Sequence, residues 1–290
     1  MEFSHHKNLV SYEDIRQNIK PFDLIAFRGG DLASRLINVL EKYEVGHGEF
    51  THVGMVVTSD ILPLCNITVD ETTKEIKLIP GKLYLYQSTF TYNVPYISDG
   101  MIDVTTGRGF FGVQLCDLEE VIPVYIINKT TKVAYCKLLS NPWELKVGEQ
   151  QESLTSRRLQ IQKDFALFFE SHQGRLYEMD PLSLLGAMFP PLRFIRDTQD
   201  QIFTSLIKKL NKWGLINISV DSNMTPAGWQ FCSELVANVY KLIGVLPDTL
   251  NSENILPITF FGYREISAPI VNAPIYLKDW DYNGKEAVIY

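Results

Sequence analysis

Three polar residues that lie far apart in the chain carry the side chains that a cysteine hydrolase needs. Cys232 supplies a thiol, His52 an imidazole and Gln87 an amide. In such an enzyme a thiolate attacks a carbonyl carbon, a histidine moves the proton, and a third group fixes the orientation of the ring. Each residue also has a simpler interpretation: a small buried hydrophobe for the cysteine, a hydrogen-bonded structural residue for the histidine, and a solvated loop residue for the glutamine.

The segment around Cys232 is typical of a buried helix. Apolar side chains recur with helical spacing at Cys232, Leu235, Val236, Val239, Tyr240 and Ile243. Gly244 stands where a helix usually ends in a left-handed residue, which predicts a helix over about 231–243. Cys232 would then lie in the first turn, where the backbone N–H groups and the helix dipole favour the thiolate, the nucleophilic form of cysteine.

Two apolar strands are predicted to carry His52 and Gln87. His52 opens the β-branched stretch 51–57, and Gly54 within that stretch allows another segment to approach closely. A histidine at the start of such a strand would lie at the edge of a sheet. The stretch 81–89 has strand character up to Gln87, so the amide would follow the strand end and point at the histidine of a neighbouring strand.

The remaining pattern predicts a single α+β domain over residues 1–290. We expect core strands over about 21–130, a helix at about 155–173, a helical insertion at about 181–228, the nucleophile helix, and a C-terminal tail at about 245–290. Within the core we expect strands at 21–27 and 121–128, a polar β-excursion at 60–80 with a turn at 70–74, and a long loop or hairpin at 90–115. His172 would be a structural residue whose positive charge suits the end of its helix.

Composition limits the classes of function. The formal net charge is −7 and no basic stripe appears, so nucleic-acid binding has no electrostatic support. The four cysteines include no C-x-x-C pair, and we therefore expect no zinc site, no disulfide framework, no cofactor and a reducing compartment. Residues 1–20 lack the apolar core of a signal peptide, and no run is long enough to span a bilayer. We expect a cytoplasmic protein, with peripheral membrane contact and oligomeric state left open.

Three short motifs and their order resemble a known family. Asp23-Leu24-Ile25-Ala26-Phe27, Thr51-His52-Val53-Gly54-Met55-Val56 and Phe231-Cys232-Ser233-Glu234-Leu235-Val236 resemble motifs of the papain-like amidases of the NlpC-like superfamily. In ordinary members the cysteine helix precedes the two strands. Here the strands come first and the cysteine helix last, which is similar to the circularly permuted branch of that superfamily.

Two further stretches extend the resemblance, and two positions depart from it. Residues 83–89 resemble the next family strand, and residues 174–177 resemble its Gly-x-x-Tyr motif. Phe22 stands where the family usually has glycine, a departure that we expect to be only structural. Gln87 stands where the family commonly has an acid. An amide can orient an imidazole, as the Cys-His-Asn arrangement does, but it adds no charge to stabilise an imidazolium.

The resemblance implies a fold and a set of roles. The fold would be a permuted papain-like one, with an antiparallel sheet or barrel packed on helices, the nucleophile at a helix N-terminus and a helical insertion. Cys232, His52 and Gln87 would be the catalytic residues. Tyr177 would be a candidate oxyanion donor beside the backbone N–H of Cys232, while Ser233 and Glu234 would support the nucleophile or the helix start.

Three functions remain compatible with the sequence. The first is a hydrolase of amide bonds in a peptide or peptidoglycan-like substrate. The second is a lipid-directed thioesterase or acyltransferase acting on an acyl-lipid. The apolar residues of the insertion 181–228 would then form a lid or a membrane contact, whereas their simpler interpretation is additional core. The third is a catalytically silent structural protein of a viral particle, which would place the chain in host cytoplasm or virion.

Overall fold

The computed structural model describes residues 9–28, 50–69, 72–89, 102–107, 112–127, 132–175, 231–262, 266 and 268–277. Tyr177, the insertion 181–228 and parts of the loop 90–115 and of the C-terminal tail lie outside them. The described residues form a mixed α+β structure around one antiparallel sheet, as the sequence predicts.

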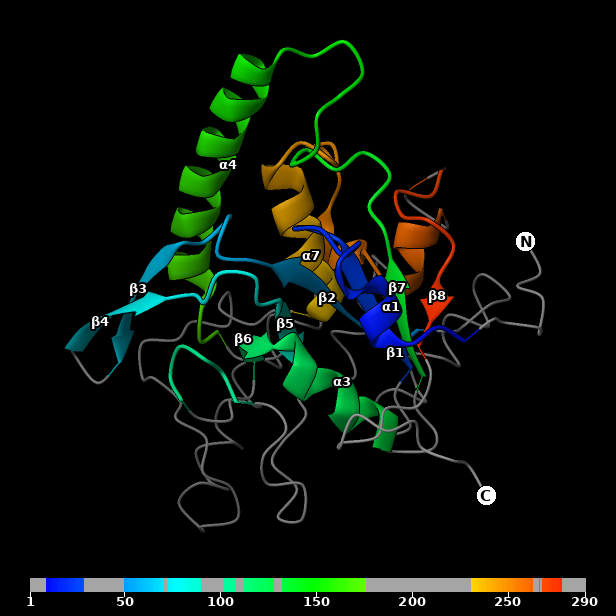
Figure 1. The fold of residues 1–290 in the computed structure, drawn as a ribbon, viewed down its shortest axis with the longest axis horizontal. Helices are drawn as coiled ribbons and strands as arrows, with labels where there is room; N and C mark the ends of the chain where they lie inside the picture. The colour runs from blue at the N-terminus through cyan, green and yellow to red at the C-terminus, as the bar shows by residue number, and fades with distance from the viewer. Residues whose placement is uncertain are drawn as a thin grey trace, which may run out of the picture.

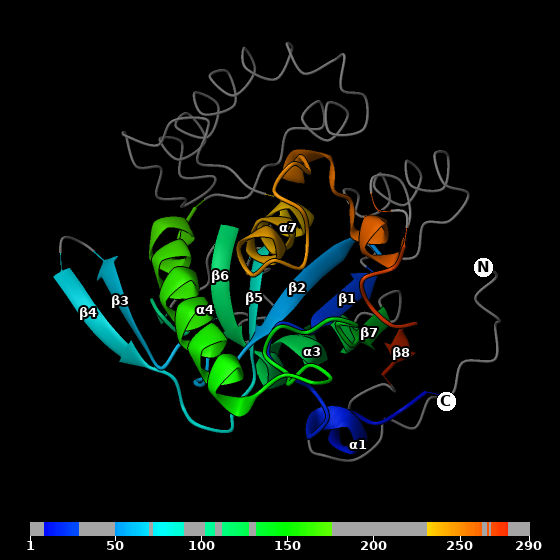
Figure 2. The same cartoon turned by 90° about the horizontal axis from the view of Figure 1, so that it is seen from above.

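The sheet has six strands in the order β6-β5-β2-β1-β7-β8, and a separate hairpin of β3 and β4 lies beside α4 (Figure 2). The strands are β1 (Leu24–Arg28), β2 (His52–Val57), β3 (Leu64–Val69), β4 (Thr72–Lys77), β5 (Tyr84–Thr89), β6 (Gly112–Asp117), β7 (Lys132–Cys136) and β8 (Ile275–Tyr276). The helices are α1 (Tyr12–Arg16), α3 (Leu118–Ile127), α4 (Gln151–His172), α7 (Cys232–Leu242), η3 (Ser252–Asn254) and η4 (Pro257–Phe261). None of the helices described here is long and apolar enough to cross a membrane.

The central strand β2 is buried on both sides, which explains its almost continuous apolar sequence. Val53, Met55 and Val57 point into the larger core, which also contains apolar residues of α4 and α7. Val56 points into a second core with residues of α1 and α3. Figure 1 shows α4 and α7 on one side of the sheet and α3 on the other. Alternate residues of β2 therefore pack against two different layers, one with α4 and α7 and the other with α1 and α3.

The motif before β1 is held by a buried carboxylate and an unusual backbone. Asp23 accepts hydrogen bonds from the backbone N–H of Lys20 and of Leu138 (both 2.9 Å) and from the Tyr135 hydroxyl (2.8 Å). Burial raises the pKa of Asp23. Phe22 has φ +68°, in the left-handed region that favours glycine, and its ring is fully buried. This conformation gives a physical reason why the resembling family has glycine at this position.

Several predicted elements are confirmed. β2 and β5 lie within the predicted strands, and β1 ends one residue past its predicted limit. The β-excursion at 60–80 is the β3–β4 hairpin, although residues 72–74 belong to β4 rather than to the turn. α4 begins at Gln151, a few residues before the predicted start, and α7 begins at Cys232. Gly174 and Gly244 follow these two helices with φ of +76° and +73°, the left-handed conformation that ends a helix.

The prediction of a strand at 121–128 is wrong, because residues 121–127 belong to helix α3. A short apolar run fits a buried strand or a buried helix equally well, so length and spacing must decide. The helical spacing is visible in the side chains that α3 buries against the sheet, which are Leu118, Val121, Ile122 and Tyr125. In the first turn, Asp117 Oδ1 accepts a hydrogen bond from the N–H of Glu119 (2.9 Å), which stabilises the helix start.

The core sheet also contains strands that the sequence does not predict. Residues 112–115 lie in the predicted long loop or hairpin and form most of β6, where Val113 and Leu115 face one core and Gln114 and Cys116 face the other side. β7 pairs with β1 beyond the predicted limit of residue 130, and β8 comes from the predicted tail. These strands are specified mainly by partners that are distant in sequence.

Candidate active site

His52 and Gln87 are in direct contact, as the sequence predicts for neighbouring strands. His52 Nε2 and Gln87 Oε1 lie 2.8 Å apart in a buried hydrogen bond. Gln87 is completely buried and His52 is 7 % exposed. Gln87 does not follow its strand but lies within it, since β5 continues to Thr89. The interpretation of Gln87 as a solvated loop residue is therefore wrong.

This contact selects one tautomer of the histidine. An amide oxygen only accepts hydrogen bonds, so Nε2 of His52 must carry the hydrogen that is donated to Gln87. In the neutral ring Nδ1 then carries the lone pair and is the basic nitrogen. A histidine in this tautomer takes up a proton at Nδ1, the atom directed away from Gln87.

Gly54 makes room for the Gln87 side chain. Gly54 lies opposite Gln87 in the β2–β5 pairing, one position beyond the pair of Met55 and Tyr86. A Cβ at Gly54 would lie 2.7 Å from Leu85 Cδ1 and 3.2 Å from Gln87 Cβ, closer than such atoms normally approach. Because Gly54 has no side chain, the Gln87 side chain can pass over it and reach His52, its diagonal neighbour on β2.

Aromatic rings fix the His52 imidazole on its other sides. The ring stacks on Tyr125 of α3 with centroids 5.9 Å apart and an interplanar angle of 7°. The Phe27 ring, from the residue paired with His52 in the sheet, lies 5.4 Å away. Tyr125 is not among the predicted site residues, because the segment was predicted as a strand, although the helical spacing of Leu118, Val121, Ile122 and Tyr125 is present in the sequence.

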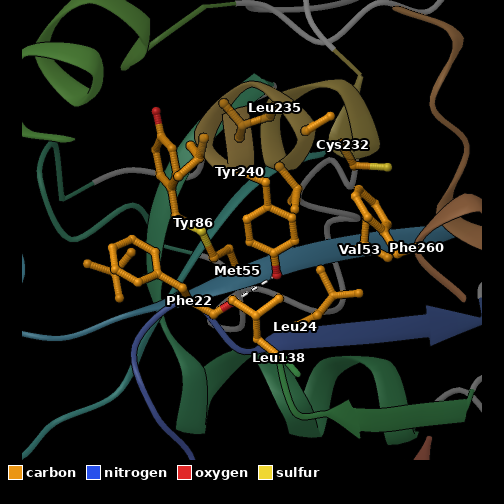
Figure 3. Close-up of a cluster of buried hydrophobic side chains, with 14 of the residues drawn as sticks. Phe22, Leu24, Val53, Met55, Tyr86, Leu138, Cys232, Leu235, Tyr240 and Phe260 are labelled. Carbon is orange, nitrogen blue, oxygen red and sulfur yellow. Dashed lines mark hydrogen bonds between the residues drawn. The ribbon is translucent and has the colours of Figure 1, made fainter. Parts of the chain in front are cut away.

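Cys232 is the first residue of α7 and is 2 % exposed. The preceding residue, Phe231, occupies the N-cap position and provides no side-chain hydrogen bond to the helix. No side chain at the N-cap therefore competes with a Cys232 thiolate for the first-turn N–H groups, which carry the positive end of the helix dipole. Figure 3 shows the Cys232 sulfur directed away from the other labelled side chains of the core.

Two hydrogen bonds fix α7 relative to the rest of the molecule. The Tyr240 hydroxyl donates to the backbone oxygen of Phe22 (2.8 Å), which ties the last turn of the helix to the segment before β1 (Figure 3). The Ser233 hydroxyl donates to the backbone oxygen of Ile255 (2.6 Å), which ties the helix start to the segment after η3. Both bonds are buried, so the position of Cys232 is set from two sides.

The helix that carries Cys232 and the ring of His52 lie on different faces of the sheet. α7 contacts β2 and β5 on the face lined by Val53 and Met55. The His52 ring lies on the other face, against Tyr125. Because side chains of a strand alternate between faces, the two residues can meet only beyond the end of the sheet. His52 is the first residue of β2, and Cys232 is the first residue of α7.

The other predicted site residues have mainly structural contacts, or lie outside the described residues. Glu234 Oε2 accepts a long hydrogen bond (3.4 Å) from the backbone N–H of Phe231, as expected for a residue that supports the helix start. Ser233 holds Ile255, as described above. Tyr177, the candidate oxyanion donor, lies outside the described part of the chain.

His172 is not the cation that was predicted for the end of α4. Burial, and then the nearby Arg175, lower its pKa to about 4, so the ring is neutral at pH 7. Its Nδ1 lies 2.9 Å from the backbone oxygen of Phe168, and the two rings stack with centroids 3.8 Å apart. Within the described ranges, no group of three or more His, Cys, Asp or Glu side chains is placed to hold a metal ion.

Comparison with known proteins adds no family to this geometry. No model of a known protein family matches the chain, and no curated protein sequence matches it. The resemblance to permuted papain-like amidases therefore depends on the motifs and on their order alone.

Proposed function

We propose that the chain is a cysteine hydrolase with a permuted papain-like fold that cleaves an amide bond in a peptide or peptidoglycan-like substrate. Cys232 is the nucleophile, His52 the general base and acid, and Gln87 the residue that orients the imidazole. The observation that carries the proposal is the buried hydrogen bond between His52 Nε2 and Gln87 Oε1 (2.8 Å), which leaves Nδ1 as the basic nitrogen.

In the proposed first step, His52 Nδ1 takes the Cys232 proton, and the thiolate sulfur attacks the carbonyl carbon of the substrate. A C–S bond forms and the carbonyl electron pair moves onto the oxygen. The tetrahedral intermediate collapses as the C–N bond breaks, and the imidazolium returns its proton to the leaving amine. Water then attacks the thioester while His52 accepts the water proton, and the C–S bond breaks to release the acid and the thiolate.

The start of α7 suits the negative charge in this scheme. Backbone N–H groups of a first helical turn bind anions, and a thiolate there is stabilised relative to the thiol. The same groups would stabilise the oxyanion of the tetrahedral intermediate, for which we propose the Cys232 N–H as one donor. Phe231 at the N-cap lacks the oxygen that would otherwise occupy such donors.

The proposal is tested by measuring the rate of iodoacetamide alkylation at each cysteine as a function of pH. Peptide mass spectrometry separates Cys232 from Cys116 and Cys136, which are completely buried thiols and serve as internal controls. We expect Cys232 to react with an apparent pKa well below the thiol reference of about 8.5. Burial, and then the charge of Asp103, raise the pKa of Cys116, so that thiol is expected to stay slow at neutral pH.

Two variants complete the test. His52→Ala should return the Cys232 profile towards that of an ordinary thiol, and His52→Gln repeats the measurement with less loss of packing against Tyr125 and Phe27. The folded state of each variant is checked by circular dichroism. An ordinary thiol profile in the unmodified protein, or a profile that neither variant alters, would overturn the proposal. So would full activity of Cys232→Ala on an amide substrate that the unmodified protein cleaves.

A further inference from the structure

Gln114 has a buried amide that forms no hydrogen bond with the described part of the chain. The residue is completely buried in β6, and neither Oε1 nor Nε2 has a hydrogen-bond partner among the described residues. Leaving a buried donor or acceptor unsatisfied costs about 1–3 kcal/mol, so such groups are rare in folded proteins. A leucine or methionine at this position would avoid that cost.

Gln114 lies beside the proposed catalytic residues. It is the direct partner of Gln87 in the β5–β6 pairing, and both side chains project from the same face of the sheet. The Cβ atoms of such a pair are about 4.5–5.5 Å apart, which brings two glutamine amides within reach of each other. His52, Gln87 and Gln114 therefore form a row across three neighbouring strands, β2, β5 and β6.

Gln87 has an NH₂ group that a carboxylate would lack, and Gln114 can provide an acceptor for it. His52 Nε2 donates to Gln87 Oε1 in the neutral ring, and it does so more strongly when the ring is protonated, because the donor then carries a charge. Gln87 therefore presents its oxygen to the ring and its NH₂ group to the other side. The Gln87 amide also forms a hydrogen bond with Cys116 on β6, which is consistent with this orientation. An acceptor at Gln114 would align a second amide dipole with the first, and hydrogen bonds in a chain strengthen one another by roughly 10–30 %.

We propose that Gln114 is a positioning residue whose Oε1 accepts a hydrogen bond from Gln87 Nε2 when His52 is protonated. This inference depends on the proposed function. The two amides then act together where the resembling family commonly uses one carboxylate. The cost of burying Gln114 is offset in the state in which Cys232 is a thiolate and His52 an imidazolium.

The test is the pH dependence of Cys232 alkylation in Gln114→Met, which keeps the length of the side chain and removes both amide groups. Loss of one hydrogen bond in this chain should slow alkylation at neutral pH about three- to tenfold and shift the profile towards that of Gln87→Leu. The double variant should be no slower than Gln87→Leu alone, because Gln114 acts only through Gln87. Gln114→Glu keeps an acceptor oxygen and should restore the profile, and Gln114→Leu is the second apolar variant.

Tyr86→Phe is the matched control. The Tyr86 hydroxyl is also completely buried without a hydrogen-bond partner, but it projects from the opposite face of β5. Its removal should leave the Cys232 profile unchanged. If Gln114→Met raises the free energy of unfolding and its Cys232 profile superimposes on that of the unmodified protein, or if the Gln87 and Gln114 effects add, the inference is overturned.

The two proposals fail in different ways. An ordinary thiol profile for Cys232 in the unmodified protein overturns the proposed function, and the role of Gln114 with it. A lowered Cys232 pKa that Gln87→Leu raises and Gln114→Met leaves unchanged overturns the role of Gln114 alone.

Discussion

Gly54 offers the most direct test of how the sheet positions Gln87. A Cβ at this position would lie 2.7 Å from Leu85 Cδ1, 2.8 Å from Leu85 Cγ and 3.2 Å from Gln87 Cβ. Inserting a methyl group into a packed core costs about 1–3 kcal/mol. Replacing glycine by alanine within a strand regains about 0.5–1 kcal/mol of backbone entropy. We therefore expect Gly54→Ala to lower the free energy of unfolding by about 1–2 kcal/mol.

The decisive measurement is a double-mutant cycle with Leu85→Ala. Leu85 is completely buried, and its truncation alone should cost about 2–5 kcal/mol. It also removes the two atoms that a Cβ at Gly54 would approach most closely. In the Leu85→Ala background, Gly54→Ala should therefore become neutral or stabilising by up to about 1 kcal/mol, a change of sign relative to the unmodified protein.

Urea unfolding followed by tryptophan fluorescence gives the free energy of unfolding of all four proteins in this cycle, since Trp143 lies in the larger core. Cys232 alkylation on the same samples reports on the site. The clash displaces Gln87 from His52, so Gly54→Ala should slow Cys232 alkylation at neutral pH. A Gly54→Ala protein as stable as the unmodified one, or a cycle in which the two changes add, would refute the argument that Gly54 makes room for Gln87.

Two further predictions concern stability. Phe22→Ala should cost about 3–5 kcal/mol because the ring is completely buried, whereas Phe22→Gly should be about 1 kcal/mol more stable than Phe22→Ala because φ is +68°. Urea midpoints compare the two variants, and equal or reversed midpoints would contradict the left-handed backbone. For His172, the folded-state pKa of about 4 lies below the unfolded value of about 6.5, so its contribution to stability is complete above pH 6.5 and is lost as the pH falls towards 4. The unfolding free energy of His172→Gln should therefore fall less between pH 7 and pH 4.5, and an identical fall in both proteins would exclude this linkage.

The sequence predicts those parts of the fold that local patterns determine. The helical spacing after Cys232 and the glycine at its end are local signals, and α7 begins at Cys232 and is followed by a left-handed Gly244. The strand that begins at His52 is marked by its β-branched, apolar residues. The contact between His52 and Gln87 was expected from the order of the two strands, and β2 and β5 are indeed neighbours.

The remaining elements depend on distant partners. β8 has only two residues, and its pairing with β7 joins residues 142 positions apart (Ala134 and Tyr276), so no local pattern marks it. β6 begins at Gly112, inside a stretch that is rich in Tyr, Phe, Gly and Thr and has little periodicity, which predicts a loop or hairpin rather than a core strand. α3 was mistaken for a strand because its apolar run is short. Two of these elements, α3 and β6, carry Tyr125 and Gln114, and so the surroundings of His52 and Gln87 were less predictable than the two residues themselves.

The arrangement of α7 shows how a nucleophile helix at the end of the chain is matched to strands at its beginning. A shift of the helix by one residue would move Cys232 by about 1.5 Å and rotate it by about 100°, enough to separate a thiol from an imidazole. The apolar face of α7 alone does not exclude small shifts, because hydrophobic packing has little directionality. The Tyr240 hydrogen bond to Phe22, 218 positions earlier in the chain, is directional and excludes them. The strained backbone of Phe22 thus has a consequence at Cys232, since it places the carbonyl that fixes the helix.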